Sequence, residues 1–137
     1  MDMKFKESVF LWLSEAQHLA EAYQDDGDAL YLQKRGYDIV RQMGFIKHAI
    51  VLSYYCLLVH AKTGGAFTYN NAIREVISLA GDSDTNACIV GGMMGALLGF
   101  KALDEHMVRS VLSCDVTGEG QPRPIWLSVG KTAVPNI

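Results

Sequence analysis

The stretch FIKHAIVLSYYCLLVHAKT, residues 45–63, carries the strongest structural signal in the chain. Its apolar residues surround a helix instead of forming one stripe, which is typical of a helix that is enclosed by other helices. The apolar part is shorter than the roughly 20 residues that cross a bilayer, and charged side chains crowd its ends. We therefore expect a buried central helix and no membrane partner.

The rest of the chain favours further helices around this one. All three prolines lie between residues 122 and 135, so no proline prevents a helix before that point. Apolar residues that recur at steps of three and four predict helices over residues 4–23, 32–43, 69–80, 84–100 and 104–114. Thr68 is the expected N-cap of the helix over 69–80. On the helix over 104–114, the residues expected to face inward are Leu103, Met107, Val108, Val111 and Leu112. The predicted fold class is all-α, an orthogonal helical bundle.

Composition limits the class of protein. With 137 residues, 50% of them apolar and 20% charged, the chain is expected to form a single domain over residues 1–137. Twelve basic and fifteen acidic side chains give a net charge of −3 without a basic block, which argues against a nucleic-acid partner. Three widely spaced cysteines without a CxxC pair suit a reducing compartment. Since the N-terminus also lacks a signal-peptide pattern, we expect an intracellular, cytoplasmic protein.

A row of glycines marks the helix expected over residues 84–100. Gly91, Gly95 and Gly99 are spaced by four, and each costs about 1 kcal/mol relative to alanine inside a helix. Such a row leaves a groove without Cβ atoms, into which a neighbouring helix can pack closely. We expect a packing seam there.

The segment GDSDTN, residues 81–86, gathers hard oxygen donors between two predicted helices. Asp82 and Asp84 supply carboxylates, and Thr85 supplies a hydroxyl, the ligand types that Mg²⁺ and Ca²⁺ prefer. Capping of the following helix by an aspartate is the alternative. A calcium loop of the EF-hand kind is excluded, because its twelfth position would be Met93. Spacing alone leaves the metal and capping interpretations open.

A second candidate group lies on the central helix. His48, His60 and Cys56 are arranged in a way that suggests zinc ligands, but no second ligand pair accompanies them, and a core thiol beside a helix-end histidine is the competing interpretation. Tyr54 and Tyr55 have the chemistry to stack on an adenine, yet aromatic residues in so apolar a helix usually belong to the core.

The acidic segment and its surroundings resemble a known family. The stretch ISLAGDSDTNA, residues 77–87, with GGMMGA at 91–96, closely resembles the C-terminal metal-binding signature of the ADP-ribosylglycohydrolases. GFIKHA, residues 44–49, looks like the start of that family's penultimate long helix, so the resemblance is strongest over residues 44–126. It implies an all-α bundle holding two Mg²⁺ ions, with Mn²⁺ as an alternative, and metal ligands that correspond to Asp82, Asp84 and Thr85.

The chain also departs from the family. Family members are considerably longer, and their N-terminal half carries a second acidic turn that completes the dinuclear site. The segment Asp25-Asp26-Gly27-Asp28 has a similar composition, but its surroundings are typical of a surface turn. No metal-ligand role is assigned to it. Ala80 stands where the family usually has a glycine. The chain resembles the C-terminal half alone.

The resemblance implies a Mg²⁺-dependent hydrolase that cuts the glycosidic link between ADP-ribose and an acceptor, with half of the metal site on this chain. Its substrate would be an ADP-ribosylated protein or a small ADP-ribose conjugate. A companion N-terminal half or a second copy of the chain would be its partner. The alternative is a non-catalytic module of the same family that binds ADP-ribose or a partner chain.

Overall fold

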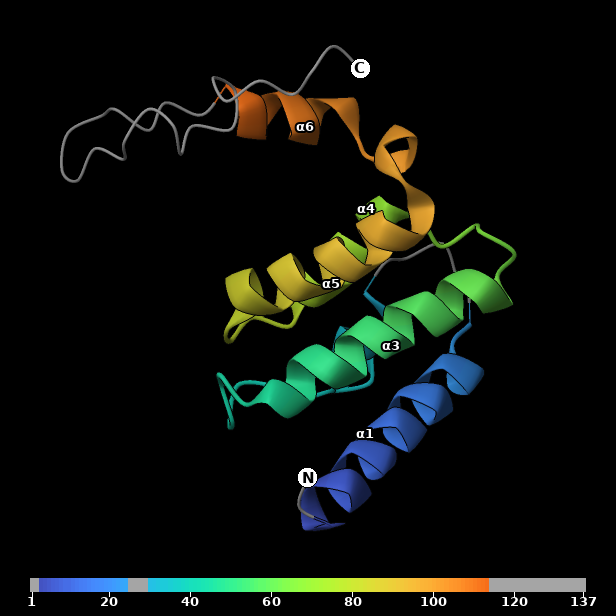
Figure 1. Ribbon diagram of the computed structural model, residues 1–137, viewed down its shortest axis with the longest axis vertical. Coiled ribbons are helices and arrows are strands. Elements are labelled where there is room, and N and C mark those ends of the chain that lie inside the picture. The colour runs from blue at the N-terminus through green and yellow to red at the C-terminus, as the bar shows by residue number, and fades with distance from the viewer. Residues whose placement is uncertain (1–2, 25–29, 114–137) are drawn as a thin grey trace, which may run out of the picture. The chain divides into compact units, whose positions relative to one another are not determined.

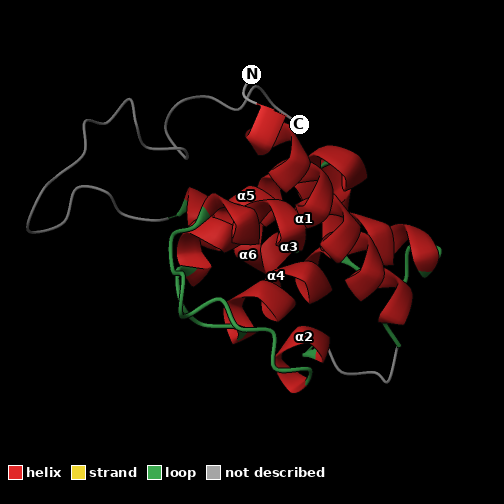
Figure 2. Ribbon diagram, turned by 90° about the horizontal axis from the view of Figure 1, so that it is seen from below, coloured by secondary structure: helices red, strands yellow, loops and turns green. Residues whose placement is uncertain are grey.

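The computed structural model describes residues 3–24 and 30–113, and these residues form helices and connecting loops without a strand (Figures 1 and 2). They fall into two units, one up to residue 102 and the other from residue 103 on. The first contains α1 (Met3–Ala22), α2 (Tyr31–Lys34), α3 (Ile46–Lys62), α4 (Tyr69–Ser78), α5 (Ser83–Leu98) and a short 3₁₀ turn (Phe100–Ala102); the second contains α6 (Glu105–Leu112). The all-α prediction is confirmed. The single-domain expectation stays a prediction.

The core of the first unit forms around α3, which lies between α1 and α5 (Figure 1). Its fully buried residues are Val51, Leu52, Tyr55, Cys56 and Val59. The predicted central helix is therefore confirmed, with a limit. Tyr54 and Leu58 remain 42% and 37% exposed, so α3 is not enclosed on every side by the described residues.

The helices α4 and α5 form the pair that carries the acidic turn. Thr68 caps α4 through a complete capping box with Asn71, as predicted. A Cβ atom on Gly91 would lie 2.8 Å from the Tyr69 hydroxyl and 3.2 Å from the Ile73 Cδ1 atom of α4. The predicted glycine seam thus exists at Gly91, whereas Gly99 ends α5 with a φ of 78° and has no neighbour within 4 Å of such an atom.

The helix predicted over residues 32–43 is wrong for most of its length. Only α2 is helical, and Gly36, with a φ of 69°, ends it. The Asp38 side chain then accepts hydrogen bonds from the backbone N–H groups of Val40 (2.9 Å) and Arg41 (3.4 Å). Aspartate competes with helical hydrogen bonds in this way. Residues 37–45 are consequently a non-helical segment, which we call the strap.

The helix α6 follows its prediction in bounds. It begins after Asp104 and ends at Leu112, close to the expected 104–114, of which residue 114 lies outside the described residues. Among the described residues none of its side chains is buried, although Leu103 and Val108 are half-buried, and the expected inward position of these two and of Met107, Val111 and Leu112 stays a prediction. Among residues 3–24 and 30–113, no helix has the length and apolar character needed to span a membrane.

Candidate functional site

The acidic turn joins the end of α4 to the start of α5. Ala80 and Gly81 both adopt left-handed backbone, with φ of 58° and 63°. Glycine takes this conformation without steric cost, whereas a residue with a Cβ does so at about 1–2 kcal/mol. Ala80 thus preserves the geometry that a glycine would give, and the turn places Asp82 at the N-cap position of α5.

Asp82 occupies the cap position without acting as a side-chain cap. Its backbone carbonyl accepts the N–H of Asn86 at 3.1 Å, but its carboxylate makes no capping hydrogen bond. The side chain is half-buried. The capping interpretation is therefore wrong for Asp82, and its carboxylate is left for another role.

Asp84 and Thr85 lie in the first turn of α5, and both are exposed. The three predicted ligands thus lie at the N-cap position and in the first turn of one helix. The partial positive charge of that helix end favours the two carboxylates. The turn presents oxygen donors at its surface, as a site for a hard cation requires.

The strap lies beside the acidic turn, a neighbour that the sequence interpretation missed. A Cβ atom on Gly81 would lie 3.4 Å from both the Cγ1 atom and the carbonyl oxygen of Ile39. A Cβ atom on Gly44, whose φ is 81°, would lie 3.9 Å from Oδ2 of Asp82. The strap at Gly44 therefore lies close to that carboxylate. The sequence signal for this neighbour was the GFIKHA segment, which contains Gly44. The incorrect prediction of a helix over 32–43 gave no reason to place that segment beside the acidic turn.

The donor set fits part of a Mg²⁺ coordination sphere. Two carboxylates and a hydroxyl are hard oxygen donors, and Mg²⁺ takes about six such ligands. In the described part of the chain, no group of three or more histidine, cysteine, aspartate or glutamate side chains is arranged to hold a metal. Any ion at Asp82 and Asp84 therefore needs further oxygen donors, from water or another chain segment. Asp25, Asp26 and Asp28 lie outside the described residues.

The histidine and cysteine group on α3 belongs to the core. His60 Nδ1 lies 2.7 Å from the carbonyl oxygen of Phe67, and Cys56 is fully buried. Burial, with a smaller contribution from the Glu75 carboxylate, raises the pKa of the Cys56 thiol far above its usual value, so a thiolate ligand is disfavoured. The core interpretation is supported over the zinc pair.

Tyr54 and Tyr55 of α3 differ in burial. Tyr55 is fully buried, and burial followed by the charge of Glu75 raises the pKa of its hydroxyl. It is a core residue, as expected. Tyr54 is exposed, so the core interpretation is wrong for it.

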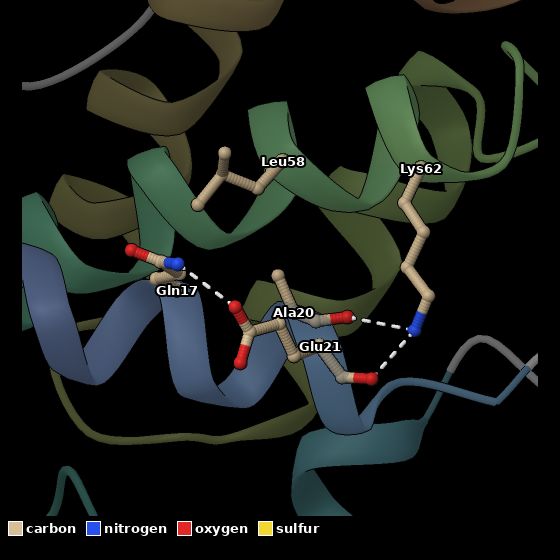
Figure 3. A pocket seen from close by; sticks show the side chains of 5 residues that line it. All are labelled: Gln17, Ala20, Glu21, Leu58 and Lys62. Atoms are coloured by element: carbon tan, nitrogen blue, oxygen red, sulfur yellow. Dashed lines mark hydrogen bonds between the residues drawn. The ribbon is translucent and has the colours of Figure 1, made fainter.

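A surface hollow of about 340 Å³ lies elsewhere, between α1 and α3 (Figure 3). Its lining residues are Gln17, Ala20, Glu21, Leu58 and Lys62, none of which belongs to the acidic turn. The Lys62 ammonium donates hydrogen bonds to the carbonyl oxygens of Ala20 (3.1 Å) and Glu21 (2.6 Å). It thereby satisfies backbone acceptors at the end of α1, which is a structural role.

Comparison with known proteins shows the family of the chain. The sequence profile of the ADP-ribosylglycohydrolase family matches residues 4–122, and the chain belongs to this family. A protein of Acanthamoeba polyphaga mimivirus, named as a proposed ADP-ribosyl glycohydrolase, L543, is 39% identical over 82 residues. That alignment covers 60% of this chain and 23% of the viral protein. No solved structure matches the chain.

Proposed function

We propose that this chain is a Mg²⁺-dependent ADP-ribosylglycohydrolase module that carries one half of a dinuclear metal site, with Mn²⁺ as a substitute ion. The observation that carries the proposal is the half-buried carboxylate of Asp82, which occupies a cap position without capping. Asp84 and Thr85 lie beside it on the first turn of α5. Family membership supplies the class of reaction.

In this proposal the chain's own residues bind and position. Asp82 and Asp84 bind through carboxylate oxygens, Thr85 adds its hydroxyl, and Gly44 of the strap lies close to Asp82 Oδ2. When bound, the two ions would orient ribose hydroxyls and make a water nucleophilic near neutral pH. The bond between the anomeric carbon of ADP-ribose and the acceptor breaks, and water supplies the new oxygen to that carbon and a proton to the acceptor. The substrate is an ADP-ribosylated protein or a small ADP-ribose conjugate.

A companion is part of the same proposal. The chain spans 23% of the length of the viral relative that it matches, and the acidic turn alone provides three side-chain ligands where two ions want about twelve. A separate N-terminal half or a second copy of the chain would supply the rest. The free thiols of Cys56 and Cys88 suit an intracellular location.

A second candidate is a non-catalytic module of the family that binds ADP-ribose or a partner chain. The outer face of α1 favours it, since Phe10 and Leu11 are 70% and 65% exposed. Apolar side chains of this size at a surface are typical of a contact with another protein.

The test is release of ADP-ribose from arginine- and serine-linked substrates in Mg²⁺, with solution mass measured by light scattering. We expect little or no turnover by the isolated chain, and turnover that depends on Asp82 when a companion half is added. Robust turnover by a strict monomer would contradict the half-site. Absence of turnover with every companion, together with ADP-ribose binding, would favour the non-catalytic module.

A further inference from the structure

A buried carboxylate outside the acidic turn joins α4 to α2. Glu75 of α4 is fully buried, and its two oxygens accept hydrogen bonds from the backbone N–H groups of Tyr31 (3.0 Å) and Leu32. These N–H groups belong to the first turn of α2, where a helix has no acceptors of its own. The pairing stabilises both the buried charge and the helix start.

The connection continues from α2 into the strap. The N–H of Tyr37 donates to the carbonyl oxygen of Leu32 at 3.0 Å, so the first strap residue is bonded to the residue that Glu75 holds. Gln33 adds a second link, because its side-chain amide donates to the carbonyl oxygen of Ser78 at the end of α4 (3.0 Å). The position of α2 therefore sets where the strap begins.

The strap in turn lies close to the acidic turn. Ile39 is buried, and a Cβ atom on Gly81 would lie 3.4 Å from it, while a Cβ atom on Gly44 would lie 3.9 Å from Asp82 Oδ2. At its far end, Phe45 packs edge-on against Trp12 of α1, with ring centroids 5.6 Å apart. A displacement of α2 would reach Asp82 through these contacts.

We propose that Glu75 is a positioning residue of the acidic turn: by holding α2 it fixes the strap against Asp82. This inference rests on the proposed metal site at Asp82 and Asp84. Side chains that orient metal ligands without touching the ion typically change metal affinity 10- to 100-fold when they are replaced.

The test is a Mn²⁺ titration of the full chain by calorimetry. Glu75→Gln keeps the side-chain size and one acceptor but removes the second acceptor, and we expect about tenfold weaker Mn²⁺ binding. Val76→Ala is the matched control, since it removes buried volume from the same helix without removing a side-chain hydrogen bond. It should lower the melting temperature and leave the Mn²⁺ affinity unchanged.

A second readout needs no metal. Trp12 and Trp126 are the two tryptophans of the chain, so a Trp126→Phe background leaves Trp12 to report on its contact with Phe45. Glu75→Gln should shift the Trp12 emission, and Val76→Ala should not. If Glu75→Gln does not fold, Gln33→Ala removes the exposed link between α2 and Ser78, and should weaken Mn²⁺ binding several-fold.

The outcomes separate the two proposals. If the wild-type chain gives no Mn²⁺ signal that Asp82→Ala abolishes, the proposed metal site fails, and the role of Glu75 fails with it. If wild type binds and Glu75→Gln, or Gln33→Ala in its place, binds equally well, only the positioning role is overturned. Equal weakening in Val76→Ala would also overturn it, because the loss would then follow stability alone.

Discussion

The helices α5 and α6 both begin at an aspartate, and the two carboxylates differ in what they bind. Asp104 has extended backbone with a ψ of 124°, and its Oδ1 accepts the N–H of Met107 at 2.9 Å. Asp82 has a ψ of 55° and makes no such bond. An extended N-cap residue directs its side chain over the first turn, whereas the left-handed pair Ala80-Gly81 delivers Asp82 in another conformation. The backbone before the helix, rather than the residue type, decides whether an aspartate caps or stays available.

The largest expected effect tests that availability directly. In the Asp82→Ala, Asp84→Ala double variant, we expect complete loss of the Mn²⁺ heat signal in calorimetry, because both carboxylate ligands are gone. Helicity should be retained, since the Asp82 side chain caps nothing. Metal binding equal to that of wild type would contradict the site, and Asp104→Ala is the control that should bind normally.

The next effect concerns the seam that holds α5 against α4. Gly91→Leu places a large side chain against Tyr69 and Ile73, and overpacking of this kind typically costs about 1–3 kcal/mol. Gly92→Ala is the matched change, because no atom lies within 4 Å of its Cβ position, and it should stabilise by up to about 1 kcal/mol. Thermal unfolding measures both. Equal melting temperatures would show that the seam does not fix the helix that carries Asp82.

The two aspartates can also be compared one by one. Asp104→Ala should cost about 1 kcal/mol at the start of α6, or about fivefold faster hydrogen exchange of the Met107 amide. Asp82→Ala should leave the exchange of the α5 amides nearly unchanged in metal-free protein. Amide exchange followed by NMR is the measurement. Equal effects at both helix starts would mean that Asp82 caps in solution.

The smallest effect concerns the buried imidazole of His48. Burial, then the charge of Lys47, lowers its pKa below the ordinary 6.5, with opposing contributions from Glu15, Asp38 and a hydrogen bond with the backbone of Gln42. The folded state therefore disfavours the protonated ring. The contribution of the neutral His48 ring to the free energy of unfolding is therefore fully present above about pH 6.5, and it is lost as the pH drops below that value.

His48→Leu removes the titrating group, so its melting temperature should fall less than that of wild type between pH 7 and pH 5. Thermal unfolding at both pH values measures the difference. Parallel acid dependence in the two proteins would show that His48 is not the group responsible.

Much of the helical framework was predictable from local chemistry. The apolar character of α3, the Thr68 cap and the close packing at Gly91 each depend on residues close in sequence, and the structure has these three features. The strap was not predictable, because Leu32, Ile39 and Met43 match a helical period while Gly36 and the Asp38 turn interrupt it.

The candidate site was likewise predictable where it depends on neighbouring residues and not where it depends on distant ones. Asp82, Asp84 and Thr85 were named from four consecutive residues. The non-capping conformation of Asp82 depends on the turn geometry, and the position of Gly44 near its carboxylate depends on a segment about forty residues away, which no local pattern contains.

The hydrogen bonds of Glu75 also bear on the order in which the helices form during folding. They join residues 43 and 44 positions apart, and α2, with four residues, is far too short to persist on its own. We therefore expect its first turn to complete after α4 has docked, on the native side of the folding barrier. Weakening α2 should accordingly speed unfolding and leave the rate of folding almost unaltered, so the strap beside the candidate site is expected to be the last part of the first unit to form and the first to open.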